Sequence, residues 1–270
     1  MNITFIGGGN MAAAMIGGLL QRGSSPEMVT VAEVNADRRA QLQHQFGIHA
    51  SPTVIEAGIN SEICVLAVKP QQLRTVATEN ATLLHDKLVI SIAAGIRAAD
   101  LSVWMGNHPR IIRAMPNTPC LIGKGMTGLY ALPGVGVTQK LQAADVLGAV
   151  GSVIWFDDEA QLDAVTAISG SGPAYVFYLL EAMQQAGTEL GLSPETARQL
   201  SLETFVGASL LAAESHESFS TLRARVTSPG GTTEQAILSL EKANVKSALT
   251  TAIEAAYKRS QEIGHILGQS

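Results

Sequence analysis

The segment with the clearest potential to bind a small anion is Val226–Thr233, which reads Val-Thr-Ser-Pro-Gly-Gly-Thr-Thr. Gly230 and Gly231 allow backbone angles that other residues avoid and let a ligand approach the main chain closely. The residues from Thr232 onward are typical of a helix start, where the first N–H groups have no intrahelical partner and carry a partial positive charge. Such a helix start can bind a carboxylate. The alternative is a tight turn in which Thr232 or Thr233 only caps the next helix.

A second glycine-rich segment, Gly7–Ala12, directly follows an apolar strand expected at residues 2–6 and opens a helix of small residues. Its spacing matches G-x-G-x-x-[G/A]. In that pattern Gly7 forms the tight turn, Gly9 lets a pyrophosphate approach the backbone, and Ala12 lets the helix pack closely on the strand. A glycine pattern alone is weak evidence, but its position between a strand and a helix is the context that dinucleotide binding requires. We therefore predict a dinucleotide site here.

The strand expected at residues 28–32 ends at Glu33. A carboxylate there can bind the ribose 2′-hydroxyl of NADH and repel the 2′-phosphate of NADPH. Arg38 and Arg39 follow in the next helix, where a guanidinium could bind that phosphate or could lie on a solvated helix face. These residues leave the choice between NADPH and NADH open.

Two further strand ends carry candidate ligand contacts. The apolar run at residues 63–68 is typical of a parallel strand buried on both faces. Lys69 lies just past its carboxyl end, where ligands bind in open α/β sheets, although a lysine at a loop edge would show the same spacing. The rigid turn Pro116–Pro119 follows the strand expected at residues 110–115. It can hold Asn117 beside a bound cofactor, or it can be an ordinary turn.

Strands and helices alternate through the first part of the chain. We expect strands at residues 2–6, 28–32, 63–68, 88–92, 110–115, 128–132 and 152–156, and helices at residues 13–20, 71–83, 98–105 and 138–150. This alternation predicts a Rossmann-type, doubly wound and mostly parallel α/β sheet.

After Asp157 the pattern is helical only. We expect helices at residues 160–168, 173–190, 194–213, 233–242 and 245–267. The sequence therefore predicts a dinucleotide-binding domain at residues 1–157 and an all-helical domain at residues 158–270. The glycine-rich segment Ser169–Tyr175 interrupts the helical pattern, and Ser171 suits either a helix cap or a ligand contact. Broad apolar helix faces indicate a homodimer formed through this domain.

Composition excludes several classes of protein. The net charge is -5 without a Lys/Arg cluster, so we expect no nucleic-acid partner. No apolar run has membrane-spanning length, and the start of the chain lacks the pattern of a secretory leader, so we expect no membrane association and a cytoplasmic location. Cys64 and Cys120 lack a CxxC or CxxH pattern and the six histidines lack metal-ligand spacing, which predicts no metal site. The acidic run Asp157–Glu159 is expected to be solvated.

Six segments occur in the order found in pyrroline-5-carboxylate reductases, and the chain resembles that family along essentially its whole length. They are Phe5–Ala12, Ala67–Pro70, Ser91–Gly95, Arg113–Pro119, Ser169–Tyr175 and Val226–Thr233. The resemblance implies reduction of 1-pyrroline-5-carboxylate to L-proline with NADPH or NADH, the last step of proline biosynthesis. It also implies a homodimer through the helical domain, and in some members a higher oligomer of dimers.

The resemblance assigns site residues by position. The expected cofactor contacts are Gly7, Gly9, Asn10, Met11, Ala12, Ala67, Val68, Lys69, Pro70, Ala93, Ala94, Gly95 and Asn117, to which the residue patterns above add Glu33 and Ser171. The expected substrate-binding residues are Ser228, Gly230, Gly231, Thr232 and Thr233, which would bind the substrate carboxylate chiefly through main-chain N–H groups.

The resemblance implies that the Thr233 hydroxyl bonds the ring nitrogen of the substrate and makes Thr233 the expected catalytic residue. Hydride transfer to an imine carbon needs proximity and a protonated imine, and it needs no nucleophile. An alcohol is a poor acid, so we expect water or the protonated substrate to supply the proton.

Two other classes of protein share parts of this pattern. β-Hydroxyacid dehydrogenases resemble one another in placing a catalytic lysine on the helix that begins the second domain, but no lysine occurs here between Lys140 and Lys242. A redox sensor that binds the dinucleotide and regulates a partner would need no substrate pocket, which would leave the Gly230–Gly231 loop without a purpose. The reductase interpretation accounts for both glycine-rich segments.

Overall fold

The computed structural model of the chain describes residues 1–57 and 60–269, the last of these without its side chain. The chain forms two compact units. The first consists of Met1–Ser171 together with the chain from Ala256 onward, and the second consists of Gly172–Ala255.

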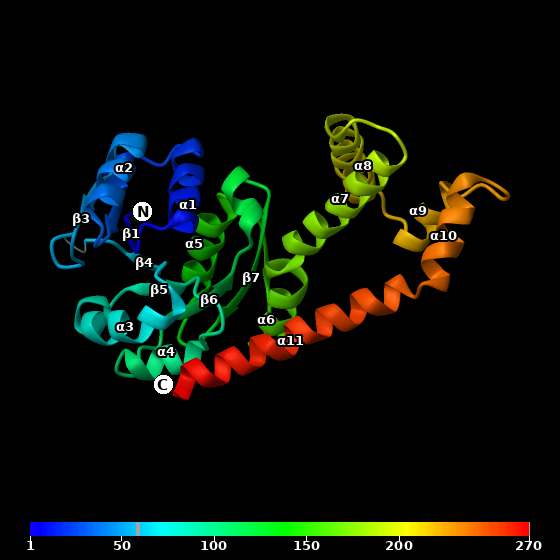
Figure 1. The fold of residues 1–270 in the computed structure, drawn as a ribbon. Coiled ribbons are helices and arrows are strands. Elements are labelled where there is room, and N and C mark those ends of the chain that lie inside the picture. Colours follow the sequence, from blue (N-terminus) through cyan, green and yellow to red (C-terminus); the bar gives the residue numbers. More distant parts are fainter. Residues whose placement is uncertain (58–59, 270) are drawn as a thin grey trace. The chain divides into compact units, whose positions relative to one another are not determined.

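An eight-stranded sheet forms the centre of the first unit (Figure 1), with the strand order β3-β2-β1-β4-β5-β6-β7-β8. Its strands are β1 (Ile3–Ile6), β2 (Val29–Ala32), β3 (His49–Ser51), β4 (Ile63–Leu66), β5 (Leu88–Ser91), β6 (Ile111–Met115), β7 (Gly125–Ala131) and β8 (Gly151–Trp155). Strands β1 to β6 are parallel, β7 is antiparallel to β6, and β8 is parallel to β7. The predicted Rossmann-type, mostly parallel sheet is confirmed. Strand β3 was not predicted, because its three residues, His-Ala-Ser, contain no apolar run.

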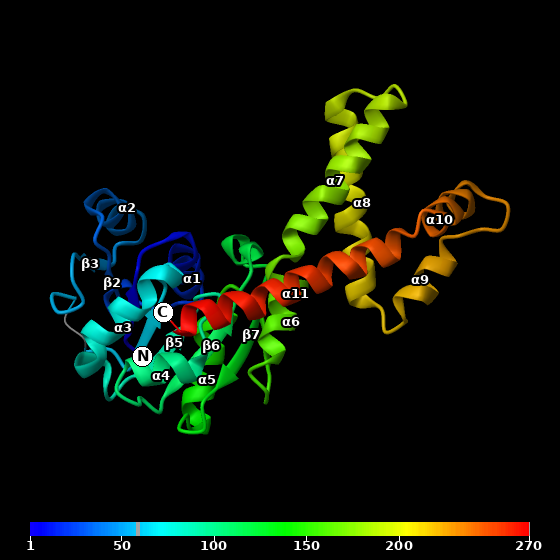
Figure 2. The same ribbon diagram turned by 60° about the horizontal axis from the view of Figure 1, so that its bottom comes forward.

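Helices cover both faces of the sheet, as Figures 1 and 2 show. They are α1 (Asn10–Gln21), α2 (Ala36–Phe46), α3 (Pro70–Leu84), α4 (Ala98–Trp104) and α5 (Val137–Gly148). Side chains of α1, α2 and α5 form one apolar cluster with the sheet, and side chains of α3 and α4 form another. Phe5 belongs to the first cluster and its neighbour Ile6 to the second, because successive side chains of a strand point to opposite faces. The central strand is therefore buried on both sides, as a parallel sheet requires.

The first unit continues beyond residue 157, where the sequence pattern predicts the domain boundary. Helix α6 (Gln161–Val165) lies directly on β7: a Cβ at Gly128 would be 2.9 Å from the Val165 Cγ1 and 3.0 Å from the Leu162 Cδ2. The π-helical turn η3 (Thr166–Gly170) follows and completes this part of the chain. The expected boundary therefore differs from the compact unit because two short helical segments after it pack on the sheet.

Helix α11 (Val245–Gln269) contributes to both units. Its later part packs on the sheet unit: a Cβ at Gly95 would be 2.6 Å from the Ile263 Cγ2, and the Ser260 hydroxyl donates to the Asp163 carboxylate at 2.7 Å. The sequence pattern places the whole of this helix in the second domain. Helical periodicity predicts that a helix forms, but it does not predict which distant segments the helix contacts. It therefore does not show that the end of α11 packs on the sheet unit.

The second unit is all helical, as predicted. It contains α7 (Gly172–Glu189), α8 (Pro194–Glu214), α9 (Phe219–Arg225), α10 (Thr232–Lys242) and the first part of α11. Helices α7 and α8 lie side by side (Figure 2). The short helix α9 was not predicted; it begins after Ser218, whose hydroxyl accepts a hydrogen bond from the Thr221 N–H at 3.2 Å. Large apolar side chains remain exposed in this unit, among them Phe177, Tyr178, Leu190 and Phe219.

Candidate functional site

The first glycine-rich loop has the geometry of a phosphate-binding turn. Gly7 has φ +100°, and its N–H donates to the Ala32 carbonyl at 2.8 Å. A Cβ on Gly7 would lie 2.7 Å from the Ala67 carbonyl oxygen, so only glycine fits between β1 and β4. Gly9 faces open space instead, with no atom within 4 Å of a Cβ built on it.

Helix α1 begins directly after this open glycine. Gly9 is its N-cap, no side chain caps the helix, and its first turn contains no acidic residue. Asn10, Met11 and Ala12 form that first turn, with Asn10 exposed, Met11 half-buried and Ala12 buried. Free N–H groups and the positive end of a helix dipole at an open position suit a phosphate group.

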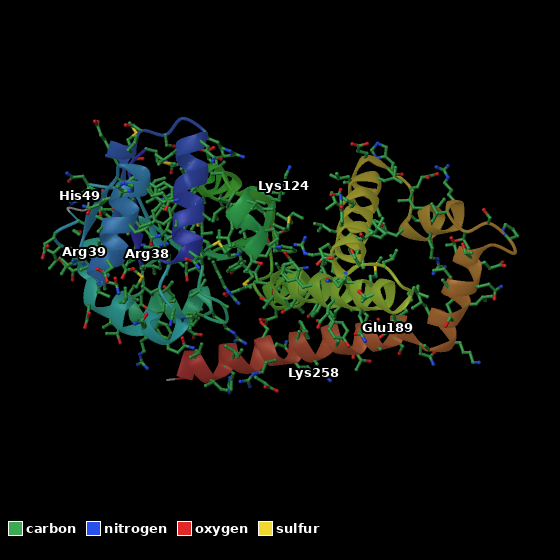
Figure 3. All side chains as sticks on the ribbon, turned by 45° about the horizontal axis from the view of Figure 1, so that its top comes forward. Arg38, Arg39, His49, Lys124, Glu189 and Lys258 are labelled. Atoms are coloured by element: carbon green, nitrogen blue, oxygen red, sulfur yellow. The ribbon has the colours of Figure 1, made fainter. Side chains whose placement is uncertain are left out.

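Glu33 and Arg38 hold the middle glycine of the loop from two sides. The Gly8 N–H donates to the Glu33 Oε2 at 2.8 Å, and the Arg38 Nε donates to the Gly8 carbonyl at 2.6 Å. The other Glu33 oxygen accepts from the Asn35 N–H at 2.8 Å, and the Arg39 Nη1 donates to the Glu33 carbonyl at 2.7 Å. Figure 3 shows Arg38 and Arg39 extending from the first part of α2. Glu33 therefore braces the glycine loop, a role that the sequence pattern does not reveal.

The segments after β4 and β5 lie at the carboxyl edge of the sheet. Ala67 and Val68 are half-buried, Lys69 is exposed as the N-cap of α3, and Pro70 is the first residue of that helix. These four positions suit the expected cofactor contacts.

After β5, Ala93 is buried and Ala94 is exposed. Gly95 has φ +80° and faces α11 at Ile263. The requirement for glycine at this position is explained by its backbone angle and by the helix packed against it.

Asn117 follows β6, and its side-chain amide bonds to two other segments of the chain. Its Nδ2 donates to the Ser169 carbonyl at 3.2 Å and to the Ser169 Oγ at 3.1 Å, and its Oδ1 accepts from the Met126 N–H at 2.9 Å. Ser171 follows the turn that contains Ser169, is half-buried, and donates its N–H to the Thr166 carbonyl at 2.8 Å.

The second glycine-rich loop joins α9 to α10 in the second unit. Gly230 has φ +72°, and the Gly231 N–H donates to the Ser228 carbonyl at 3.0 Å. Gly231 is the N-cap of α10 without a side-chain cap, and Thr232 and Thr233 are the first two helical residues. The alternative in which one of these threonines caps the helix is therefore wrong. Thr232 and Ser228 are exposed and Thr233 is half-buried, so the loop presents hydroxyls and a helix start together.

One contact in this loop was not foreseen from the sequence. The Gly230 N–H donates to the Oε2 of Glu234 at 2.8 Å. A carboxylate of the protein thus already binds one main-chain N–H of the loop. The signal in the sequence is an acidic residue four positions after the glycine, in the first turn of the helix, where carboxylates bind free N–H groups.

The first unit also contains a buried ionic cluster. Arg113 on β6 is 3% exposed and approaches Glu159 at 3.1 Å and Asp163 at 3.9 Å. Glu159 also accepts from the Ala98 N–H at 2.7 Å, and Asp163 accepts from Ser260. Glu159 was expected to be solvated with its acidic neighbours; that expectation is wrong, because a buried arginine lies beside it.

Neither cysteine is poised for chemistry. Burial raises the pKa of the Cys64 thiol to about 11 and raises the pKa of the Cys120 thiol as well. Among residues 1–57 and 60–269, no group of three or more His, Cys, Asp or Glu side chains could hold a metal ion. Within the same residues no helix is long and apolar enough to cross a membrane.

The sheet, the glycine loop and the helical unit define a dinucleotide-binding oxidoreductase of Rossmann type. Two family models match the chain: pyrroline-5-carboxylate reductase dimerisation at residues 159–263, and NADP oxidoreductase, coenzyme F420-dependent, at residues 2–95. The chain is 46% identical to a pyrroline-5-carboxylate reductase of Pseudomonas aeruginosa over 99% of its own length and 98% of the relative's. It belongs to the pyrroline-5-carboxylate reductase family.

Solved structures agree with this assignment. A pyrroline-5-carboxylate reductase from Coxiella burnetii has a TM-score of 0.92 at 42% identity, covering 97% of this chain and 98% of that one. A pyrroline carboxylate reductase from Plasmodium falciparum with NADP bound has a TM-score of 0.86 at 30% identity and covers 98% of both chains.

Proposed function

We propose that this protein reduces 1-pyrroline-5-carboxylate to L-proline by hydride transfer from a nicotinamide dinucleotide to the imine carbon, as the last step of proline biosynthesis. The observation that carries the proposal is the full-length similarity to reductases of that name, together with both glycine-rich loops at helix starts. No second function is favoured by a specific feature of the described residues.

The proposed cofactor is NADP(H), with NAD(H) as the alternative. The residues fit a dinucleotide, because Gly9 is open on the side where a Cβ would stand and α1 begins beside it with no acidic residue in its first turn. When bound, the dinucleotide supplies the hydride. NADPH is supported by the positive charges of Arg38 and Arg39 beside Glu33, and by the NADP in the Plasmodium falciparum relative.

The proposed substrate site is the loop from Ser228 to Thr233. Main-chain N–H groups at the start of α10, those of Thr232 and Thr233, would bind the substrate carboxylate. The Thr233 hydroxyl would bond the ring nitrogen and orient the imine. Because an alcohol does not readily release a proton, the protonated imine or a water molecule supplies the proton that the product amine carries.

The two units would divide this work. The first unit would bind the dinucleotide through Gly7–Ala12 and the strand ends. The second would bind substrate and form the homodimer, with a higher oligomer of dimers as an extension. The family model for dimerisation spans residues 159–263, and large apolar side chains of the second unit are exposed in the single chain, which supports self-association. A cytoplasmic location is part of the same proposal.

The test is the decrease of reduced-nicotinamide absorbance with 1-pyrroline-5-carboxylate, run in parallel with NADPH and NADH, with proline quantified in the product. Oxidation with stoichiometric proline is expected, faster with NADPH. Protein that binds dinucleotide but oxidises neither cofactor would refute the proposed reaction. Size-exclusion chromatography with light scattering measures the oligomer in the same sample.

A further inference from the structure

The turn η3 between α6 and α7 is a π turn. The Ser171 N–H donates to the Thr166 carbonyl at 2.8 Å, a bond that spans five residues instead of four. The Thr166 hydroxyl donates to the Leu162 carbonyl at 2.8 Å, a bond typical of bent helices. Such a turn contains one residue more than an α-helical turn. Since successive helical residues are rotated by about 100°, the extra residue rotates the next side chain, that of Ser171, by about that angle.

This rotation falls at the glycine-rich motif Ser169–Gly172. If residues 166–170 formed a regular α-helix instead, the side chain of Ser171 would point in a different direction. Ser171 is a proposed cofactor contact. The π turn therefore determines the direction in which the Ser171 side chain points.

Asn117 links the π turn to the start of β7 by hydrogen bonds. Its Nδ2 donates to the carbonyl and hydroxyl oxygens of Ser169, and its Oδ1 accepts from the Met126 N–H at the start of β7. A side-chain amide carries donors on its nitrogen and an acceptor on its oxygen, so it can bond to both segments at once. A second contact lies beside it: a Cβ on Gly170 would be 2.6 Å from the Met115 methyl group. The turn is thus held against the last residues of β6.

We propose that Asn117 is a positioning residue of the reductase site, which acts through Ser169 by keeping the π turn in place and does not bind the dinucleotide with its side chain. This inference rests on the proposed function. It differs from the cofactor contact that the family resemblance implies for Asn117, because both ends of the amide bond to the protein.

Two substitutions separate the contacts. Asn117→Asp keeps the size and the oxygen that binds Met126, but it places a carboxylate oxygen against the Ser169 carbonyl. Ser169→Ala removes only the hydroxyl and keeps that carbonyl. Asn2→Asp, at an exposed position, makes the same chemical change as a matched control.

For Asn117→Asp we expect kcat/KM for 1-pyrroline-5-carboxylate to fall by about 10- to 100-fold, while the dissociation constant of NADPH, measured by nicotinamide fluorescence, stays within about twofold. Ser169→Ala should lower kcat/KM by about threefold. The variant that combines Asn117→Ala with Ser169→Ala should have a kcat/KM no lower than that of Asn117→Ala alone, because the two residues act as one unit. A tenfold weaker NADPH affinity in Asn117 variants with Ser169→Ala unaffected would show a direct cofactor contact. A lower melting temperature with unchanged kinetic constants would show a purely structural role. Either result overturns the proposal.

Hydrogen exchange gives a readout independent of turnover. In the wild-type protein the Ser171 amide should be protected by its bond to Thr166, and Asn117→Asp should remove that protection while the Asn2→Asp control retains it. Unchanged exchange in Asn117→Asp would refute the inference even in an active enzyme. If the wild-type protein does not reduce 1-pyrroline-5-carboxylate at all, the proposed function fails separately, and the exchange result still decides whether Asn117 holds the turn.

Discussion

The main-chain N–H of Gly230 donates to the Glu234 carboxylate, with 2.8 Å between the nitrogen and Oε2. This bond lies inside the loop proposed to bind the carboxylate of the substrate. Two carboxylates near one helix start repel each other and compete for the same N–H groups. Glu234 is therefore expected to set the affinity of the loop for an anionic substrate.

Glu234→Gln should lower KM for 1-pyrroline-5-carboxylate by about two- to fivefold with little change in kcat, because the amide keeps an acceptor for Gly230 and removes the repulsion. Glu241→Gln on the same helix is the charge-matched control. Initial rates at saturating dinucleotide measure both variants. A KM that rises in Glu234→Gln would mean that the carboxylate chiefly rigidifies the loop.

Thr233→Ala should lower kcat by about one to two orders of magnitude, the loss of one hydrogen bond made to the reacting ring (about 1.5–3 kcal/mol). Thr233→Ser keeps the hydroxyl and should restore most of the rate. Dinucleotide affinity should be unchanged in both variants. Equal rates for the alanine variant and the wild type would remove the hydroxyl from the mechanism.

Glu33→Ser should shift cofactor preference toward NADPH by about three- to tenfold in the ratio of dissociation constants, because the carboxylate that repels a 2′-phosphate is lost. Both affinities should also weaken, since the brace on the Gly8 N–H is removed. Fluorescence titrations with NADPH and NADH measure the ratio. An equal loss of affinity for NADPH and NADH would mean that Glu33 stabilises the loop and does not contribute to cofactor preference.

Ser260→Ala should lower the free energy of unfolding by about 1–2 kcal/mol, because the Asp163 carboxylate loses a buried hydrogen bond. Arg113→Leu should cost more, about 3–5 kcal/mol, since it leaves two carboxylates without their buried cation. Urea titrations of the two variants measure the difference. A smaller loss for Arg113→Leu than for Ser260→Ala would mean that the carboxylates reach water when the cation is removed.

Stability should fall as the pH drops below about 6.5, in part because of His108. Burial lowers the pKa of His108 in the folded protein, with the positive charge of Arg110 as a further cause. At a pH between the pKa values of the folded and unfolded states, His108 is protonated in the unfolded chain and neutral in the folded protein. The free energy of unfolding therefore decreases with falling pH. His108→Gln should flatten this slope in urea titrations from about pH 7 to about pH 5. An identical slope in His108→Gln would assign the effect to other groups.

Local patterns predicted most of the fold because the buried strands are continuous apolar runs and Gly7–Ala12 lies between a strand and a helix. They gave no signal for β3, whose three residues carry no pattern, and they place the domain boundary at residue 157, before the end of the first compact unit. There, Leu162 and Val165 pack on Gly128, a contact between distant parts of the chain.

The same distinction applies to the site. The two glycine-rich loops could be predicted because the residues that identify them are adjacent in the sequence. The pairings of Glu33 with Gly8 and of Asn117 with Ser169 could not, because each depends on where a distant segment folds back. Gly95 illustrates the difference: the motif indicates a cofactor contact, whereas its backbone angle and the nearby Ile263 account for the glycine.

The division of α11 between the two units affects the order in which the protein can fold during synthesis. The chain leaves the sheet unit at Ser171 and returns to it at Ala256, so the second unit is an insertion within the first. A ribosome therefore completes all of α7 to α10 before it releases Ile263 and Ser260, which cover Gly95 and bind Asp163. The sheet begins to emerge first, yet it is the last part of the molecule to be finished, and a nascent chain paused before Ala256 still lacks the segment that closes it.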